Sequence, residues 1–302
     1  QDLATRIRML GWNKKFLGIV LLLPAMVFIV GVILYPLLST LFMAFRSMDL
    51  LKPSAGTPFV GLDNFKWLFT WPNFTISLVN SIVLTLASTA GQVLIALLLA
   101  VLFNEHFAGR KVLRGFLILP WAIPTYVAAI VWRWLLDANY GVINLFLLKI
   151  GILNQPIDWY GSIHTAMPTV IVSHIWKGLP WVFLVILAGL QTINEEHRES
   201  AAVDGATGWQ AFMRVILPQL RYIIGIAFLL RAIWYFNWFD FVYLLTGGGP
   251  ANQTMILPIA VYNIAFEGYR FGRGAAISTF MFLILAVFVV VYLNLTFKEE
   301  KI

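Results

Sequence analysis

Long apolar runs separated by short polar segments dominate the pattern of this chain. Each run is long enough to supply the roughly 20 residues that an α-helix needs to cross a hydrocarbon layer about 30 Å thick. The pattern therefore predicts about six membrane-spanning helices. Their expected ranges are residues 16–45, 76–103, 112–135, 165–190, 220–245 and 275–297. We expect an all-α membrane protein in which residues 1–302 form a single transmembrane domain.

Proline and glycine indicate where these helices should be irregular. Pro36, in LYPLL, predicts a bend or break in the first span, because proline cannot donate the helical hydrogen bond. Gly178 and Pro180 predict a kink in the fourth span, which would open a cavity near mid-membrane. The segment TGGGPANQTMILPIAVYNIAFEGYRFG, after the fifth span, favours a loop followed by an interfacial or partly re-entrant helix.

Composition supports lipid as the solvent. Of the 302 residues, 60% are hydrophobic and only 12% are charged, whereas soluble domains carry roughly 25% charged residues. The chain has no cysteine, so disulfides and thiolate metal sites are excluded. Its net charge of +7 needs no nucleic-acid partner, because membrane proteins use Lys and Arg to set their orientation.

Lys and Arg are concentrated on one set of loops, which predicts the orientation. The loops assigned to the cytoplasm hold Arg6, Arg8, Lys14, Lys15, Arg110, Lys111, Arg114, Arg198, Arg214, Arg221, Lys298 and Lys301. The opposite loops hold Arg46, Lys52, Lys66, Lys149, Arg270 and Arg273. Both termini and residues 192–219 are therefore expected in the cytoplasm, and residues 48–74 and 137–164 outside.

The segment EEHRESAAVDGATGWQAFMRVILPQL, residues 195–220, is polar although it lies between two apolar runs. Thr192 or Asn194 can cap a helix here, and Glu195 follows Thr192 by three residues, as in a capping box. Gly205 predicts the end of that helix, because glycine adopts left-handed backbone at little cost. Small residues leave one side of the helix thin: Ser200, Ala201, Ala202 and Ala206. The segment is either a solvated helical loop or a helix that fits a groove on another protein.

The spacing ESAAVDGAT…F…ILP resembles the EAA loop of ABC importer permeases. The matching positions are Glu199, Ala201, Ala202, Asp204, Gly205, Ala206, Phe212, Ile216, Leu217 and Pro218. Ser200 departs from the pattern, in which alanine is commoner, but it is still small. LTGGGPANQTMIL…VYNIAF and FLILPWAIPTYVAAIVWRWL look like the carbohydrate-uptake subfamily, and within it the maltose-, glycerol-phosphate- and trehalose-type first permease subunit. The similarity covers nearly the whole chain after Gly18.

This resemblance implies the type I ABC importer permease fold, with residues 193–218 as a cytoplasmic coupling-helix loop. It implies that the following residues couple the chain to a separate ATPase: Glu195, Glu199, Ala201, Ala202, Asp204, Gly205 and Ala206. Glu199 is expected to make the polar contact, and the small residues to supply the shape. A mere helix-capping role for Glu199 is the alternative.

The resemblance also implies the assembly. The expected partners are a second similar permease, two copies of an ABC ATPase that binds ATP and Mg, and an extracytoplasmic solute-binding protein. The chain itself is expected to hold no cofactor or metal and to lie in a bacterial or archaeal cytoplasmic membrane. The implied function is half of the pathway of an importer for a sugar or oligosaccharide such as a disaccharide. Glycerol phosphate or another small polar solute is the alternative cargo.

Charged and aromatic residues within the spans predict a solute pathway, because charges inside a membrane normally face protein or a wet cavity. The candidates are Lys177, Trp181, Arg231, Trp234, Asn237, Trp238, Asp240 and Phe241. Trp faces can stack on sugar rings, while amide, carboxylate and ammonium groups bind hydroxyls. The alternative is structural: Asp240 would pair with Lys177 or Arg231, and the aromatic residues would only pack.

The sequence argues against catalysis by this chain. It has no G-x-x-x-x-G-K-[ST] phosphate loop, no H-E-x-x-H and no G-x-S-x-G. Its histidines, at 106, 164, 174 and 197, are not paired at ligand spacing. An intramembrane enzyme, which would turn over substrate alone, and an ion-driven carrier, which would need no ATP, are the rival classes.

Overall fold

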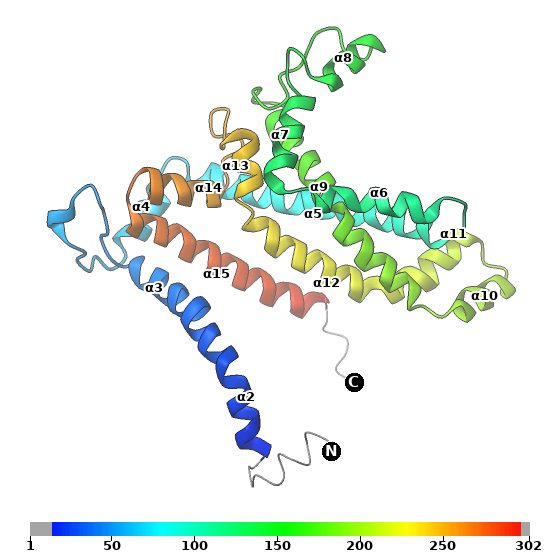
Figure 1. The fold of residues 1–302 in the computed structure, drawn as a ribbon, viewed down its shortest axis with the longest axis horizontal. Coiled ribbons are helices and arrows are strands. Elements are labelled where there is room, and N and C mark those ends of the chain that lie inside the picture. The colour runs from blue at the N-terminus through cyan, green and yellow to red at the C-terminus, as the bar shows by residue number, and fades with distance from the viewer. Residues whose placement is uncertain (1–13, 297–302) are drawn as a thin grey trace. The chain divides into compact units, whose positions relative to one another are not determined.

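The computed structural model describes residues 14–296 and is almost entirely helical (Figure 1). The α-helices are α2 (Lys14–Phe28), α3 (Tyr35–Met43), α4 (Asp63–Thr70), α5 (Phe74–Asn104), α6 (Arg110–Ala122), α7 (Thr125–Leu135), α8 (Val142–Lys149), α9 (Ala166–Gln191), α10 (Glu195–Val203), α11 (Gly208–Ala211), α12 (Leu217–Phe236), α13 (Asp240–Thr246), α14 (Leu257–Tyr262) and α15 (Phe271–Thr296). Three π-helical segments, η1 (Ile29–Leu34), η3 (Phe212–Ile216) and η4 (Asn263–Glu267), and the 3₁₀ turn η2 (Pro53–Ala55) join them. Over residues 14–296, β-structure is limited to two isolated bridges, so the predicted all-α class is confirmed.

Five helices in the described range are long and apolar enough to cross a membrane: Gly18–Met43, Phe74–Asn104, Ala166–Gln191, Gly208–Phe236 and Phe271–Thr296. The pair α6 and α7 counts as a sixth span, broken by a bend of 100°. The prediction of about six spans is confirmed. Between the fifth and sixth, Leu257–Glu267 forms the short apolar helix that was expected there.

Pro36 does not break the first span. The span continues from Gly18 to Met43, and its irregularity is the π-helical segment η1, which ends two residues before Pro36. A proline has no N–H to donate to the preceding turn, and a widened turn accommodates the carbonyl groups left without that donor. The proline thus changes the helix type locally.

Two other spans differ from their predicted bounds. The third is interrupted at Ile123 and Pro124, because residue 123 is extended and Pro124 starts a new helix instead of continuing the old one. The fifth begins at Gly208, before the predicted start, and ends at Phe236. Residues 240–246, expected to continue it, form the separate helix α13.

The chain forms two compact units. One comprises Gln1–Leu68 with Ile264–Thr279, and the other Phe69–Asn263 with Phe280–Ile302. In the first unit, the end of the first span packs on the start of α15 through Ala44, Ala275 and Ala276. The exposed side chains of the first span are apolar, which suits a helix surrounded by lipid.

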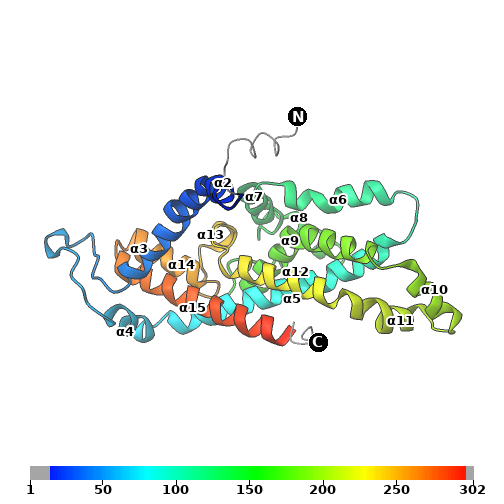
Figure 2. The ribbon, with the colours of Figure 1, turned by 90° about the horizontal axis from the view of Figure 1, so that it is seen from below.

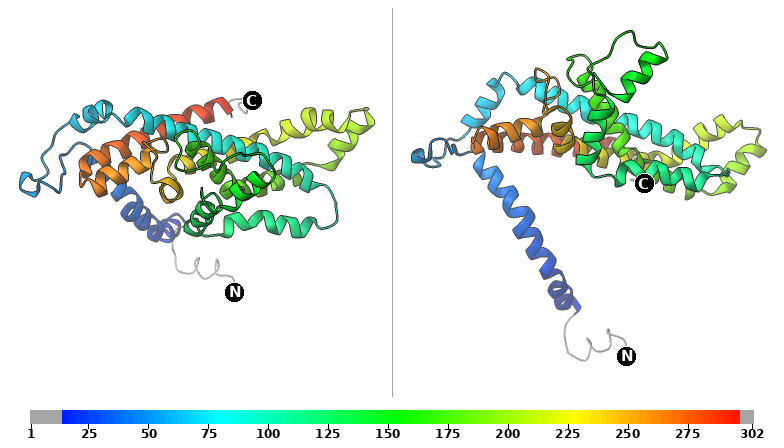
Figure 3. Two further views of the ribbon diagram at one scale, coloured as in Figure 1. Left: turned by 90° about the horizontal axis from the view of Figure 1, so that it is seen from above. Right: turned by 45° about the horizontal axis from the view of Figure 1, so that its top comes forward.

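In the second unit, α5 packs against α9 and α12, while α6 packs against α9 (Figures 2 and 3). The side of α5 that is buried carries mostly small or polar residues, together with Phe74, Leu84, Val93 and Phe103. The small or polar ones are Ser77, Asn80, Ser81, Thr85, Ser88, Thr89, Gln92, Ala96 and Ala100. Helices in membranes pack through such residues, because they let backbones approach closely. This arrangement brings side chains of α5, α9 and α12 to one place.

The connection between α9 and α12 leaves the bundle of the second unit. It contains the short helix α10, which projects beyond the ends of the long helices, as Figures 1 and 3 show. Helix α11 is the first turn of the fifth span. Helix α9 leads into this connection and α12 leads out of it, so α10 is linked along the chain to two spans.

Candidate functional site

A cavity of about 430 Å³ lies in the second unit, where α6, α9 and the end of α12 meet. We call it the α9–α12 cavity. It is lined by Trp121, Lys177, Gly178, Arg231, Ile233, Trp234, Asn237 and Trp238. Lys177, Arg231, Trp234, Asn237 and Trp238 were among the predicted pathway residues, and the fold brings them together here.

Arg231 is held at the cavity wall by a buried polar network. Its side chain is 4% exposed, and Nε donates to Oε1 of Gln92 on α5 over 3.1 Å. Nη2 donates to the Tyr235 hydroxyl, which in turn donates to the backbone carbonyl of His174 over 2.9 Å. Gln92, wholly buried, also donates to that carbonyl over 2.8 Å. These hydrogen bonds, from Nε and Nη2, help to compensate the burial of the guanidinium.

Gly178 makes room for this network. A methyl group at position 178 would overlap with the guanidinium of Arg231, the hydroxyl of Tyr235 and the amide of Gln92. Helix α9 runs unbroken from Ala166 to Gln191 through both Gly178 and Pro180. The glycine therefore allows the close approach of these three side chains. The kink expected from Gly178 and Pro180 stays a prediction.

Lys177 is anchored to the break between α6 and α7. Its Nζ donates to the carbonyl of Pro120 over 2.8 Å and also to that of Ile123. In a continuous helix the Pro120 carbonyl would accept from the N–H of residue 124, but residue 124 is a proline and has none. Lys177 thus supplies the donor that the broken span lacks. This carbonyl cage also compensates an ammonium group that is only 5% exposed.

Aromatic rings surround the Arg231 guanidinium. Its central carbon lies 4.3 Å from the ring centre of Tyr235, 5.5 Å from that of Trp234 and 5.8 Å from that of Trp238. Trp181 does not line the cavity, but its ring packs on Trp234 at 5.0 Å. Such cation–π contacts hold the guanidinium by its faces.

Two further predicted pathway residues lie outside the cavity lining. Phe241 is wholly buried and packs its ring 5.0 Å from that of His174. Asp240 is exposed in the first turn of α13 and interacts with Lys177 only through long-range electrostatics. Over residues 14–296, neither Lys177 nor Arg231 forms an ion pair with Asp240. The two cations are instead satisfied by carbonyl, amide and hydroxyl groups.

Helix α10 is capped at both ends. Asn194, not Thr192, caps α10, because its Oδ1 accepts from the N–H of Glu196 over 3.2 Å. Gly205 has a φ of +79°, and the N–H groups of Gly205 and Ala206 donate to the carbonyls of Ala202 and Ala201, at 3.0 and 2.9 Å. This is the Schellman arrangement that ends a helix at glycine.

Most of α10 is exposed. The exposed residues include Glu196, Glu199, Ser200, Ala202, Val203 and Asp204, while Ala201 faces inward and Ala206 is half-buried. Val203, an apolar residue at the end of α10, is 87% exposed. The side chain of Glu195 lies outside what the structure describes. Helix α10 is thus a short, largely exposed helix with a cap at each end.

Comparison with known proteins gives the family. Residues 92–298 match the family described as "Binding-protein-dependent transport system inner membrane component". This chain belongs to that family. It is 31% identical over 285 residues to the trehalose/maltose transport system permease protein MalF of Thermococcus litoralis, with 94% of this chain and 95% of the relative covered. It is 32% identical over 290 residues to the sulfoquinovosyl glycerol transport system permease protein SmoG of Agrobacterium fabrum, covering 95% and 92%.

A solved structure confirms the fold. One chain of a bacterial alginate ABC transporter, in complex with an alginate pentasaccharide-bound periplasmic protein, superposes with a TM-score of 0.82. The two chains are 25% identical, and 100% of this chain and 99% of the other are covered. The predicted type I ABC importer permease fold is thereby confirmed, and the chain is a permease of the ABC importer class.

Sequence reasoning missed three residues of the site. Gln92 and His174 support Arg231 from α5 and α9, and Trp121 lines the cavity from α6. Gln92 did carry a signal, since it is the one glutamine in a 31-residue, mostly apolar helix. The backbone role of His174 carried none, because any residue has a carbonyl.

Proposed function

We propose that this chain is one transmembrane half of an ATP-driven importer that takes up a sugar or oligosaccharide such as a disaccharide. The α9–α12 cavity carries the proposal. Its volume of about 430 Å³ falls within the ~300–1,000 Å³ of small-molecule sites. Trp234, Trp238 and Trp121 offer flat apolar faces to a sugar ring, and Asn237 offers hydrogen bonds beside them. The two relatives and the alginate transporter are named for carbohydrate cargo, which supports the same class of solute for this chain.

A solute that carries a negative charge is the second candidate. Lys177 and Arg231 both line the cavity, and no carboxylate is among its lining residues. Two like charges at a surface of low dielectric favour an anion. The sulfoquinovosyl glycerol and alginate transporters handle acidic carbohydrates, and glycerol phosphate has the same character.

We infer that α10 docks on a separate ATPase and transmits its closure to α9 and α12. The coupling residues are Glu195, Glu199, Ala201, Ala202, Asp204, Gly205 and Ala206. The projection of α10 from the bundle, its caps and the exposed Val203 support this role. Movement of a docked α10 would tilt both spans that it joins.

The remaining assembly is part of the same proposal. A second similar permease completes the passage, two ATPase copies bind ATP and Mg, and an extracytoplasmic protein delivers the solute. Residues 1–302 act as one permease domain with both termini in the cytoplasm of a bacterium or archaeon. The charge distribution between the loops supports this orientation.

The test is uptake by the assembled complex. The chain is produced with the second permease, the ATPase and the binding protein encoded beside it, and reconstituted in vesicles loaded with ATP. Radiolabelled trehalose, maltose and an oligouronate are then compared. Trp238→Ala should lower kcat/KM roughly tenfold, corresponding to about 1.4 kcal/mol. Trp134→Ala is the matched control, because Trp134 on α7 is 65% exposed and lies outside the cavity.

The result separates the candidates. If Lys177→Gln and Arg231→Gln abolish uptake of the anionic solute but leave uptake of neutral sugars intact, transport of the anionic cargo depends on these two cations. If an assembled, ATP-hydrolysing complex takes up none of these carbohydrates, the proposal is refuted.

A further inference from the structure

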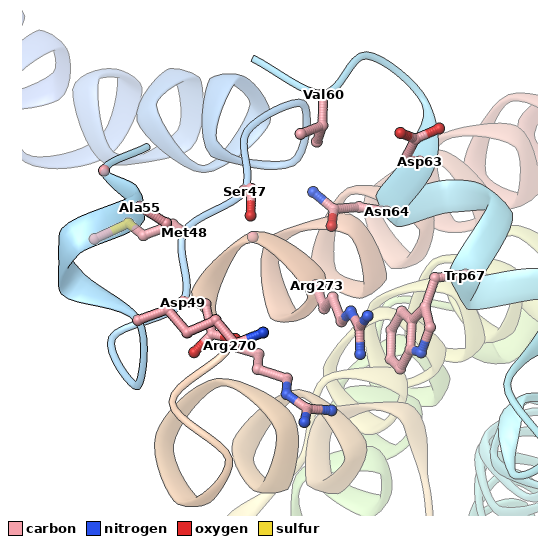
Figure 4. A pocket seen from close by; sticks show the side chains of 13 residues that line it. Ser47, Met48, Asp49, Ala55, Val60, Asp63, Asn64, Trp67, Arg270 and Arg273 are labelled. Carbon is pink, nitrogen blue, oxygen red and sulfur yellow. The ribbon is translucent and has the colours of Figure 1, made fainter. Parts of the chain in front are cut away.

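A second cavity, in the first unit, is separate from the solute cavity and unused by the proposed transport mechanism. Its volume is about 270 Å³, and its walls include Ser47, Asp49, Asn64, Trp67, Arg270 and Arg273 (Figure 4). Lys52 also contributes to the lining. We call it the Arg270 cavity.

The frame of this cavity is well built. Asn64 on α4 is 7% exposed, and its Nδ2 donates to the carbonyls of Ala44 and Arg46 at 2.8 and 2.9 Å. Any side chain at Gly272 would overlap with the Arg46 carbonyl, so the start of α15 lies directly against the turn that follows the first span. An isolated antiparallel β-bridge between the backbones of Asp49 and Arg270 ties the same two segments together. The walls therefore come from three segments fixed to one another by backbone contacts.

The cavity lining carries three cations, Arg270, Arg273 and Lys52, and two carboxylates, Asp49 and Asp63. Arg270 and Arg273 interact with each other as like charges, whereas Asp49 attracts Arg273. Asp63 already pairs with Lys66 over 3.0 Å, and Asp49 accepts from the backbone N–H of Leu51 over 3.0 Å. An anion between the two guanidinium groups would relieve their repulsion.

Trp67 positions one of these guanidinium groups. The central carbon of Arg273 lies 4.6 Å from the ring centre of Trp67, and Figure 4 shows the two side chains together. A ring that holds a guanidinium by its face leaves the N–H edges available to donate. Over residues 14–296, neither Arg270 nor Arg273 forms an ion pair. Within the described residues, the donors that suit a phosphate or carboxylate fork are therefore not paired with a carboxylate.

The place of the cavity in the fold indicates which anion this is. The first span ends at Met43, just before Ser47, and the last span begins at Phe271, beside Arg270. Ala44 and Ala275 pack together, so both spans end at this level. Ends of spanning helices that carry Trp and Arg lie at the boundary between hydrocarbon and headgroups. The last turns of α3 expose Leu38 and Phe42, at 42% and 70%, as apolar surface for an acyl chain.

We propose that the Arg270 cavity binds the phosphate group of a phospholipid headgroup, with Arg270 and Arg273 as its ligands and Trp67 holding Arg273 in place. A lipid seated here would fasten the turn after the first span to the start of α15. A headgroup is favoured over a protein carboxylate because the cavity lies at the ends of two spanning helices, where headgroups are concentrated.

The test uses the purified transporter complex after delipidation. Native mass spectrometry titrates it with dihexanoyl phosphatidylglycerol and, separately, with a glycolipid of the same chains and no phosphate. The phospholipid should bind, and Arg270→Gln with Arg273→Gln should weaken it at least tenfold. Arg214→Gln, an exposed arginine outside the cavity, is the control and should bind as the native protein does. Arg270→Gln alone, at an exposed side chain, covers the case in which the double variant fails to assemble.

Three results would overturn the proposal. In the first, the phospholipid binds the arginine variants as tightly as the native chain. In the second, inorganic phosphate at equal concentration displaces the lipid fully, so that the ligand is a free ion. In the third, the variants keep the lipid but lose affinity for the solute-binding protein, so that the cavity is a protein contact.

Discussion

Gly178 lies where three polar side chains from two other helices meet α9. Gln92 comes from α5, whereas Arg231 and Tyr235 come from α12. All three use the space that a side chain at position 178 would fill. The position of the guanidinium at the cavity wall therefore depends on the absence of a single methyl group.

Gly178→Ala should displace Arg231 and disturb the cavity. Overpacking a buried site costs about 1–3 kcal/mol, so we expect a lower thermal midpoint and at least a fivefold loss of uptake. Thermal unfolding in detergent and uptake in vesicles measure the two effects. Gly115→Ala on α6 is the control, because a methyl group there meets nothing within 4 Å. Equal behaviour of the two variants would show that the network tolerates displacement.

At the scale of elements, local hydrogen bonds shape both α10 and the segment that comprises α8 and the loop after it. Gly205 ends α10 with left-handed backbone, whereas Gly208 starts α11 with ordinary backbone. Asn144, 1% exposed on α8, accepts from Trp159 Nε1 over 2.9 Å and donates to the Ile157 carbonyl over 2.9 Å. Such elements keep their form without support from a large core.

Gly205→Ala should weaken coupling more than Gly208→Ala. Alanine in left-handed backbone costs about 1–2 kcal/mol, while position 208 imposes no such strain. Stimulation of ATP hydrolysis by the solute-loaded binding protein should fall severalfold in the first variant and stay near normal in the second. If both variants couple normally, the geometry that ends α10 is unimportant for docking.

The turn at Asp137 should respond to acid. Hydrogen bonds from the N–H groups of Asn139 and Tyr140 to its carboxylate, the first at 2.8 Å, lower the pKa of Asp137 below its ordinary value. A lowered folded-state pKa means that the stabilisation is present at neutral pH and is lost as the pH falls through that pKa. At pH 7, hydrogen exchange at residues 138–141 should therefore be slower in the native chain than in Asp137→Asn. In acid, the two proteins should exchange at the same rate.

Asp204→Asn serves as the control for this comparison. Asp204 is exposed at the end of α10, outside this turn, so its replacement should leave exchange at residues 138–141 unchanged. Identical exchange of the native chain and Asp137→Asn at pH 7 would show that the carboxylate does not stabilise the turn.

At the scale of the whole molecule, the absence of cysteine makes orientation directly measurable. Ala55→Cys and Val203→Cys place one thiol each at exposed positions on loops predicted to lie on opposite sides. An impermeant maleimide should label Ala55→Cys in right-side-out vesicles and Val203→Cys in inside-out vesicles. Adding the ATPase should protect Val203→Cys, because α10 would then be covered.

The opposite labelling pattern would reverse the orientation inferred from Lys and Arg. Labelling of Val203→Cys that the ATPase leaves unchanged would remove α10 from the interface while leaving the orientation intact. The two conclusions are thus tested separately by one pair of variants.

The chain alone determined its class, its spans and the position of the α10–α11 connection, because these depend on local quantities. Unbroken apolar helices are stable in lipid because all their backbone groups are hydrogen-bonded within the helix. Caps such as Asn194 and Gly205 act within one helical turn. Only the tertiary structure decided that Gly178 makes room for Arg231. It alone placed Lys177 on the Pro120 carbonyl and gathered Arg270, Arg273 and Trp67 in one cavity. These outcomes depend on which side chains distant segments bring within hydrogen-bond or van der Waals distance, and spacing along one helix carries no information about that.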